Sequence, residues 1–112
     1  MYAEVLIVPD CPHQTGASSL LRTVLDELGF GDVPVNTTMI DTIQTARQRG
    51  FVGSPTFLIN GIDAFPAPGR PPAVACRLYP HPGRLDGLPD PAELRRAVLH
   101  AVQRTRGEPL RH

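Results

Sequence analysis

The 112-residue sequence has no lysine and no tryptophan, only two cysteines, and no long apolar run. All eleven basic residues are arginine, and they balance eleven acidic residues to a formal net charge of zero. A neutral chain gives no broad electrostatic reason to bind nucleic acid or an anionic membrane surface. No apolar run approaches the length needed to cross a bilayer. We therefore expect neither a nucleic-acid partner nor a membrane partner.

The N-terminus also lacks the pattern of a secretory leader. It has no basic segment followed by an apolar stretch and a cleavage site, and it enters an apolar strand pattern almost at once. We therefore expect a cytoplasmic protein, in which thiols are kept reduced and a cysteine is more often reactive than structural. Cys11 and Cys76 lie too far apart in sequence to indicate a zinc site, and we expect no metal and no cofactor.

The composition is that of a single globular domain over residues 1–112. Hydrophobic residues make up 41% of the chain and charged residues 20%, which is ordinary for a folded protein. The length is close to the common size for one hydrophobic core. The thirteen prolines concentrate between residues 66 and 91, so we expect residues 66–89 to be a Pro-rich loop inserted before the last helix.

Apolar periodicity predicts the order β-α-β-α-β-β-α. Asn60-Gly61 between two apolar runs indicates a tight hairpin turn. Asp41 followed by Gln44 indicates a helix start, and so does Asp90-Pro91 followed by Glu93. Strands separated by helices favour parallel pairing, and the hairpin adds an antiparallel edge to a mixed sheet with helices on both sides. The predicted strands span residues 4–8, 33–40, 56–60 and 62–65, and the predicted helices span residues 13–28, 41–49 and 90–105.

Two motifs resemble the thioredoxin superfamily. One is V-L-I-V-P-D-C-P-H-Q, a strand that runs into Cys11-Pro12 at the start of a helix. The other is G-F-V-G-S-P-T-F-L-I-N-G, from Gly50 to Gly61, which is similar to the family segment that holds a cis-proline and leads into a β-hairpin. The element order matches over nearly the whole chain. The resemblance implies a three-layer α/β/α thioredoxin-like fold and thiol–disulfide oxidoreductase activity.

The resemblance identifies Cys11 as the candidate catalytic thiol. A thiol in the first turn of a helix faces free backbone N–H groups and the positive end of the helix dipole, and both favour the reactive thiolate. Pro55, expected to be cis, is placed beside Cys11, with the Ser54 backbone free to pair with an extended substrate. Pro12 and His13 are the other candidate substrate-binding residues, and His13 is also a candidate to stabilise the thiolate.

The sequence departs from the family at Gln14, where a dithiol oxidoreductase carries its second cysteine. Cys76, in A-C-R-L-Y, is the candidate replacement, because the Pro-rich loop allows it to fold back over Cys11. It then resolves the mixed disulfide, unless an external thiol such as glutathione does so. The alternative for Cys76 is a small buried hydrophobic residue. Arg70, Arg77 and Arg84 are expected to be solvated, although together they suit an anion.

Three functions remain open. The first is thiol-dependent redox chemistry on a protein or glutathione-like disulfide. The second is soft-metal handling by Cys11 and Cys76, either mercury binding or cleavage of an organomercurial, because two thiolates suit mercury. The sequence is similar to small bacterial thioredoxin-like proteins, some of which carry the alkylmercury lyase name, and Asp10 is then the candidate proton donor. The third is a non-catalytic thioredoxin-like binding module. Nothing in the sequence selects an oligomeric state.

Overall fold

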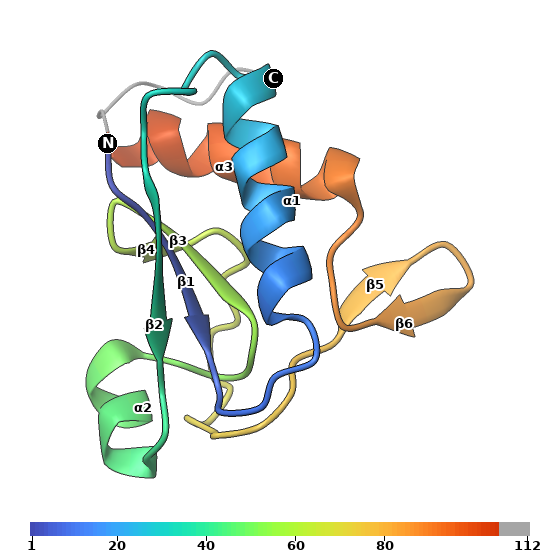
Figure 1. The fold of residues 1–112 in the computed structure, drawn as a ribbon. Coiled ribbons are helices and arrows are strands. Elements are labelled where there is room, and N and C mark those ends of the chain that lie inside the picture. Colours follow the sequence, from blue (N-terminus) through green and yellow to red (C-terminus); the bar gives the residue numbers. More distant parts are fainter. Residues whose placement is uncertain (106–112) are drawn as a thin grey trace.

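The computed structural model describes residues 1–105, which form a mixed α/β fold with three helices (Figure 1). The first six elements follow the predicted order β-α-β-α-β-β, and an additional hairpin precedes the last helix. In chain order the elements are β1 (Ala3–Ile7), α1 (Gln14–Glu27), β2 (Val35–Met39), α2 (Ile43–Arg49), β3 (Thr56–Ile59), β4 (Ile62–Asp63), β5 (Tyr79–His81), β6 (Arg84–Asp86) and α3 (Pro91–Thr105).

The main sheet has four strands in the order β2-β1-β3-β4. β1 pairs with β2 in parallel, as expected for strands joined through a helix. β3 is antiparallel to β1 and to β4, which confirms the mixed sheet and the hairpin at Asn60-Gly61. β1 and β3 are buried along their whole length. β1 therefore ends inside the protein, and the chain continues from its end to Cys11.

Helices α1 and α3 cover one face of this sheet (Figure 1). Val5 lies on that face, opposite Phe57 of β3 and Thr37 of β2. The Ser18 hydroxyl of α1 lies 3.2 Å from the Thr37 hydroxyl. Both helices have one apolar side, and those apolar positions form the core with the strands. The buried helix residues are Ala17, Leu21, Val24 and Leu25 of α1 and Leu94, Val98, Ala101 and Val102 of α3.

Helix α2 is linked to the opposite face of the sheet by an ion pair between Arg49 and the buried Glu4. Glu4 alternates with Val5 along β1, so its side chain points away from α1. Its carboxylate accepts a hydrogen bond of 2.6 Å from Arg49, at the end of α2, and another from the Thr38 hydroxyl. Glu4 is buried, and these two donors satisfy a charge that would otherwise be costly to bury.

Two local predictions are wrong. α2 is capped by Thr42, whose hydroxyl accepts from the Thr45 N–H, and not by Asp41 with Gln44. Residues 66–89 are not loop throughout, because β5 and β6 form an antiparallel hairpin that projects beside the start of α3 (Figure 1). The two residues between these strands, Pro82 and Gly83, suit a tight turn, and Gly83 has the positive φ of 76° that such a turn requires.

No helix within residues 1–105 is long and apolar enough to span a bilayer.

The packing of α3 gives a direct test of the core. Leu94 is fully buried and Leu99, on the same helix, is 43% exposed. We expect Leu94→Ala to lower the free energy of unfolding by about 3 kcal/mol, because it leaves a cavity under the sheet. The matched control Leu99→Ala should change it by less than about 0.5 kcal/mol. Urea unfolding followed by circular dichroism measures both, and equal losses would contradict the assigned face of α3.

Candidate functional site

Cys11 lies in the turn between β1 and α1, one turn before the helix. Its N–H donates to the Val8 carbonyl and its own carbonyl accepts from the Gln14 N–H, each at 3.3 Å. Asp10 has a positive φ of 58°, which turns the chain sharply after the strand. Because α1 begins at Gln14, the prediction that Cys11 sits in the first turn of the helix is wrong. Cys11 is also only 8% exposed.

The Ser54 hydroxyl is the polar partner of the Cys11 sulfur. The Val8 N–H donates to Ser54 Oγ at 3.1 Å, and Ser54 Oγ donates to Cys11 Sγ at 3.1 Å. The oxygen therefore already accepts one hydrogen bond, and its single proton points at the sulfur. A donor aimed at sulfur stabilises negative charge there, which is the state needed for nucleophilic attack.

The Ser54 backbone is not free, which corrects the prediction of an open edge for an extended substrate. Its N–H donates to the Ala75 carbonyl and its carbonyl accepts from the Arg77 N–H, both at 2.8 Å. We call residues 75–77 the strap. The strap runs parallel to the chain at Ser54, and Cys76 is the bridge partner of Ser54. Ser54 contacts the Cys11 sulfur through its side chain and holds the Cys76 segment through its backbone.

Cys76 lies between the two paired residues of the strap and is exposed. The interpretation of Cys76 as a small buried hydrophobic residue is therefore wrong. Both cysteines are free thiols in the structure. The pair thus consists of a buried sulfur that accepts a hydrogen bond and an exposed sulfur on the neighbouring backbone segment.

Arg77 anchors the strap from inside the protein. Its side chain is 4% exposed, so the expectation of a solvated arginine is wrong. The guanidinium pairs with Asp63 at 2.9 Å, donates to the Phe65 carbonyl, and lies 5.1 Å from the centre of the Tyr79 ring. These contacts supply the compensation that a buried charge requires. Arg84, in contrast, is exposed and pairs with Asp86 on the hairpin, so it does not share this site.

Gly53 allows this close approach. A Cβ atom built at Gly53 would lie 2.7 Å from the Cβ of Arg77, closer than real side chains approach. The glycine in G-S-P-T therefore leaves room for the strap.

The Ser54–Pro55 peptide bond is cis, as predicted. The Pro55 carbonyl accepts a hydrogen bond of 2.5 Å from the Tyr79 hydroxyl, two residues beyond Arg77. Burial raises the pKa of Tyr79 well above its ordinary value, although the nearby Arg77 charge acts to lower it. Tyr79 also packs edge-on against Phe57 and Phe65, with ring centres 6.1 and 5.1 Å apart. Hydrogen bonds from Arg77 to Ser54 and from Tyr79 to Pro55 thus hold the chain on both sides of Leu78.

The other predicted residues make no hydrogen bond to the Cys11 sulfur. His13 precedes α1 but makes no side-chain cap, and its ring packs against Gly87 at the hairpin end. Asp10 and Pro12 are exposed. Within residues 1–105, no group of three or more His, Cys, Asp or Glu side chains lies close enough to hold a metal ion.

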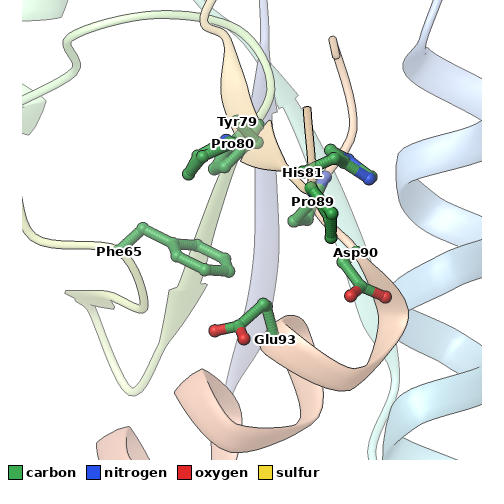
Figure 2. Close-up of a pocket in the computed structure, with 8 residues that line it drawn as sticks. Phe65, Tyr79, Pro80, His81, Pro89, Asp90 and Glu93 are labelled. Carbon is green, nitrogen blue, oxygen red and sulfur yellow. The ribbon is translucent and has the colours of Figure 1, made fainter. Parts of the chain in front are cut away.

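A separate cavity of about 340 Å³ lies between the β5–β6 hairpin and the start of α3 (Figure 2). Figure 2 shows the Phe65 ring and the Glu93 carboxylate bordering this space. Neither cysteine lines it, so the cavity is distinct from the thiol site. Its lining residues are Phe65, Tyr79, Pro80, His81, Pro82, Pro89, Asp90 and Glu93.

Sequence reasoning missed Arg77 and Tyr79 as parts of the site. Their roles depend on contacts with residues far away in sequence, namely Ser54, Pro55 and Asp63. The Pro82-Gly83 pair was an available turn signal for the hairpin whose two strands it joins.

No protein-family model, no curated protein and no solved structure matches the chain.

The hydrogen bond to sulfur predicts a role for Ser54 in the reactivity of Cys11. In a Cys76→Ser background, we expect Ser54→Ala to slow alkylation of Cys11 by iodoacetamide at neutral pH about tenfold, because the thiolate loses a hydrogen-bond donor. Ser18→Ala, which removes a hydroxyl contact on α1, is the matched control and should leave the rate unchanged. An unchanged or faster rate in Ser54→Ala would contradict this role.

The raised pKa of Tyr79 predicts a loss of stability at high pH. The unfolded chain releases the Tyr79 proton from about pH 10, whereas the folded protein retains it. The stability that protonated Tyr79 gives the folded protein is therefore fully present below that pH and is lost as the pH rises further. We expect the free energy of unfolding to fall above about pH 10 in the wild type and less steeply in Tyr79→Phe. Tyr2→Phe, at an exposed position, should retain the wild-type slope, and parallel slopes in all three would refute the assignment.

Proposed function

We propose that the chain is a thioredoxin-like thiol–disulfide oxidoreductase in which Cys11 attacks and Cys76 resolves. The observation that carries the proposal is the double role of Ser54. Its hydroxyl donates to Cys11 Sγ, and its backbone pairs with the residues on both sides of Cys76. The strand order, the mixed sheet and the cis bond before Pro55 are consistent with the thioredoxin-like fold that the motifs suggest.

The first step forms a mixed disulfide. Cys11 Sγ, as thiolate, attacks one sulfur of the substrate disulfide, and the other substrate sulfur leaves as a thiolate. The donor on Ser54 Oγ stabilises the attacking form of Cys11. The released thiolate takes up a proton from water.

The second step closes the intramolecular disulfide. Cys76, as thiolate, attacks Cys11 Sγ, and the second substrate sulfur leaves. The substrate has then gained two electrons and the two cysteines have lost them. Two molecules of an external thiol then reduce the Cys11–Cys76 disulfide through a mixed disulfide, and they leave joined to each other as a disulfide. Because Cys76 is exposed, it meets solvent and can be deprotonated there before it attacks.

The same two thiols also support the soft-metal alternative, in which they hold one mercury ion between them. This alternative needs no external disulfide. The binding-module alternative cannot use the backbone edge next to Pro55, because the strap occupies it.

The test is mass spectrometry of the protein after mild oxidation and alkylation without reduction. We expect a Cys11–Cys76 disulfide, seen as a loss of two hydrogens with no alkyl group added. Cys76→Ser and Cys11→Ser serve as the matched controls, and each should take up one alkyl group. Two alkylated cysteines in the oxidised wild type would overturn the dithiol proposal.

Mass spectrometry also distinguishes metal binding from disulfide formation. Addition of Hg²⁺ to the reduced protein tests for one ion per chain. Loss of that ion in both single variants, together with no disulfide after oxidation, would favour the soft-metal function instead.

A further inference from the structure

We infer that the strap restricts the site to small disulfides by occupying the backbone edge that an extended polypeptide would need. The inference rests on the proposed function, because it assigns the substrate class of the same site. The resident strap makes a small, glutathione-sized disulfide the preferred partner of Cys11.

Free backbone hydrogen-bonding groups decide whether an extended peptide can dock beside Cys11. An extended peptide docks on a protein edge by pairing its main chain with free N–H and C=O groups. Beside Cys11, the residue whose side chain touches the sulfur is Ser54. Its N–H and its C=O are both already used by the strap, at 2.8 Å each. A polypeptide therefore has to displace the strap to pair there, whereas a small disulfide needs no backbone partner.

The contacts of Arg77 hold the strap in place. Displacing it would pull Arg77 away from Asp63, the Phe65 carbonyl and the Tyr79 ring. The guanidinium is buried, and Tyr79 is itself hydrogen-bonded to Pro55. Opening the strap would therefore leave the buried Arg77 guanidinium without its partners, which is costly.

Access to the Cys11 sulfur is narrow. Cys11 is 8% exposed, which leaves little room for a bulky group beside it. Cys76, between the two anchored residues of the strap, is exposed. The strap thus excludes a competing polypeptide and, at the same position, presents the chain's own resolving thiol.

The experiment compares two probes with the same leaving group. The small probe is the mixed disulfide of 2-mercaptoethanol with thionitrobenzoate, and the large probe is an uncharged ten-residue peptide whose single cysteine carries thionitrobenzoate. In each case Cys11 attacks the probe sulfur and releases the coloured thionitrobenzoate. All proteins carry Cys76→Ser, which keeps the strap backbone and leaves Cys11 as the sole thiol. Urea-unfolded protein gives the intrinsic ratio of the two probe rates.

In the folded parent we expect the large probe to react at least about tenfold more slowly, relative to the small probe, than in urea. Arg77→Ala should raise the large-probe rate about tenfold by releasing the strap, with little change in the small-probe rate. Asp63→Asn, which weakens the anchor while keeping the Arg77 side chain, should act in the same direction if Arg77→Ala does not fold. Arg84→Ala, which removes an exposed arginine with its own aspartate partner, is the matched control and should change neither rate.

A folded parent that reacts with both probes in the unfolded ratio would overturn the inference. So would a folded Arg77→Ala or Asp63→Asn variant that keeps the parent ratio. These outcomes do not depend on a Cys11–Cys76 disulfide, because Cys76 is absent from every protein tested. Failure of the proposed redox function is read from the disulfide mapping, and failure of the strap inference is read from the probe ratio.

Discussion

The site depends on Ser54, a single residue whose polar atoms are all committed. Its hydroxyl joins the end of β1 to the Cys11 sulfur, and its backbone holds the strap. Three chain segments that are distant in sequence therefore meet at one residue, which is 1% exposed. Each polar atom of Ser54 makes a hydrogen bond, and hydrogen bonds in such a buried position are strong. Movement of any one of the three segments would therefore displace the other two.

The second constraint is the buried charge of Arg77. Burying a guanidinium is favourable only when good partners surround it, and here the partners come from β4, from the segment after it, and from the Tyr79 ring. Gly53 completes the arrangement by making room for the Arg77 backbone. The position of Cys76 is consequently set by its two neighbours, because Ala75 and Arg77 pair with the Ser54 backbone and the Arg77 side chain anchors the segment. This explains how an exposed residue in a Pro-rich segment acquires a defined place.

The sequence was informative wherever local chemistry decided the structure. Apolar periodicity located all three helices and the first three strands, Asn60-Gly61 located the hairpin, and Asp90-Pro91 located the start of α3. The sequence was uninformative where a contact between residues far apart in the chain decided the structure. An arginine in a Pro-rich stretch looks like a surface residue, and only its meeting with Asp63 makes it a buried anchor. The same holds for Ser54, whose edge looked open because the residues that cover it come more than twenty positions later.

The separation of the two cysteines along the chain has a consequence for how oxidation would affect the whole domain. A bond within a Cys-x-x-Cys pair closes a very short loop and constrains the unfolded chain little. A bond between Cys11 and Cys76 would enclose α1, β2, α2, β3 and β4 in one covalent ring. Closing a ring of that size removes entropy from the unfolded chain worth about 4 kcal/mol in the simple loop model. By thermodynamic linkage, the tendency of these two thiols to oxidise is tied to the folding of the domain, so destabilised protein would also be more easily reduced.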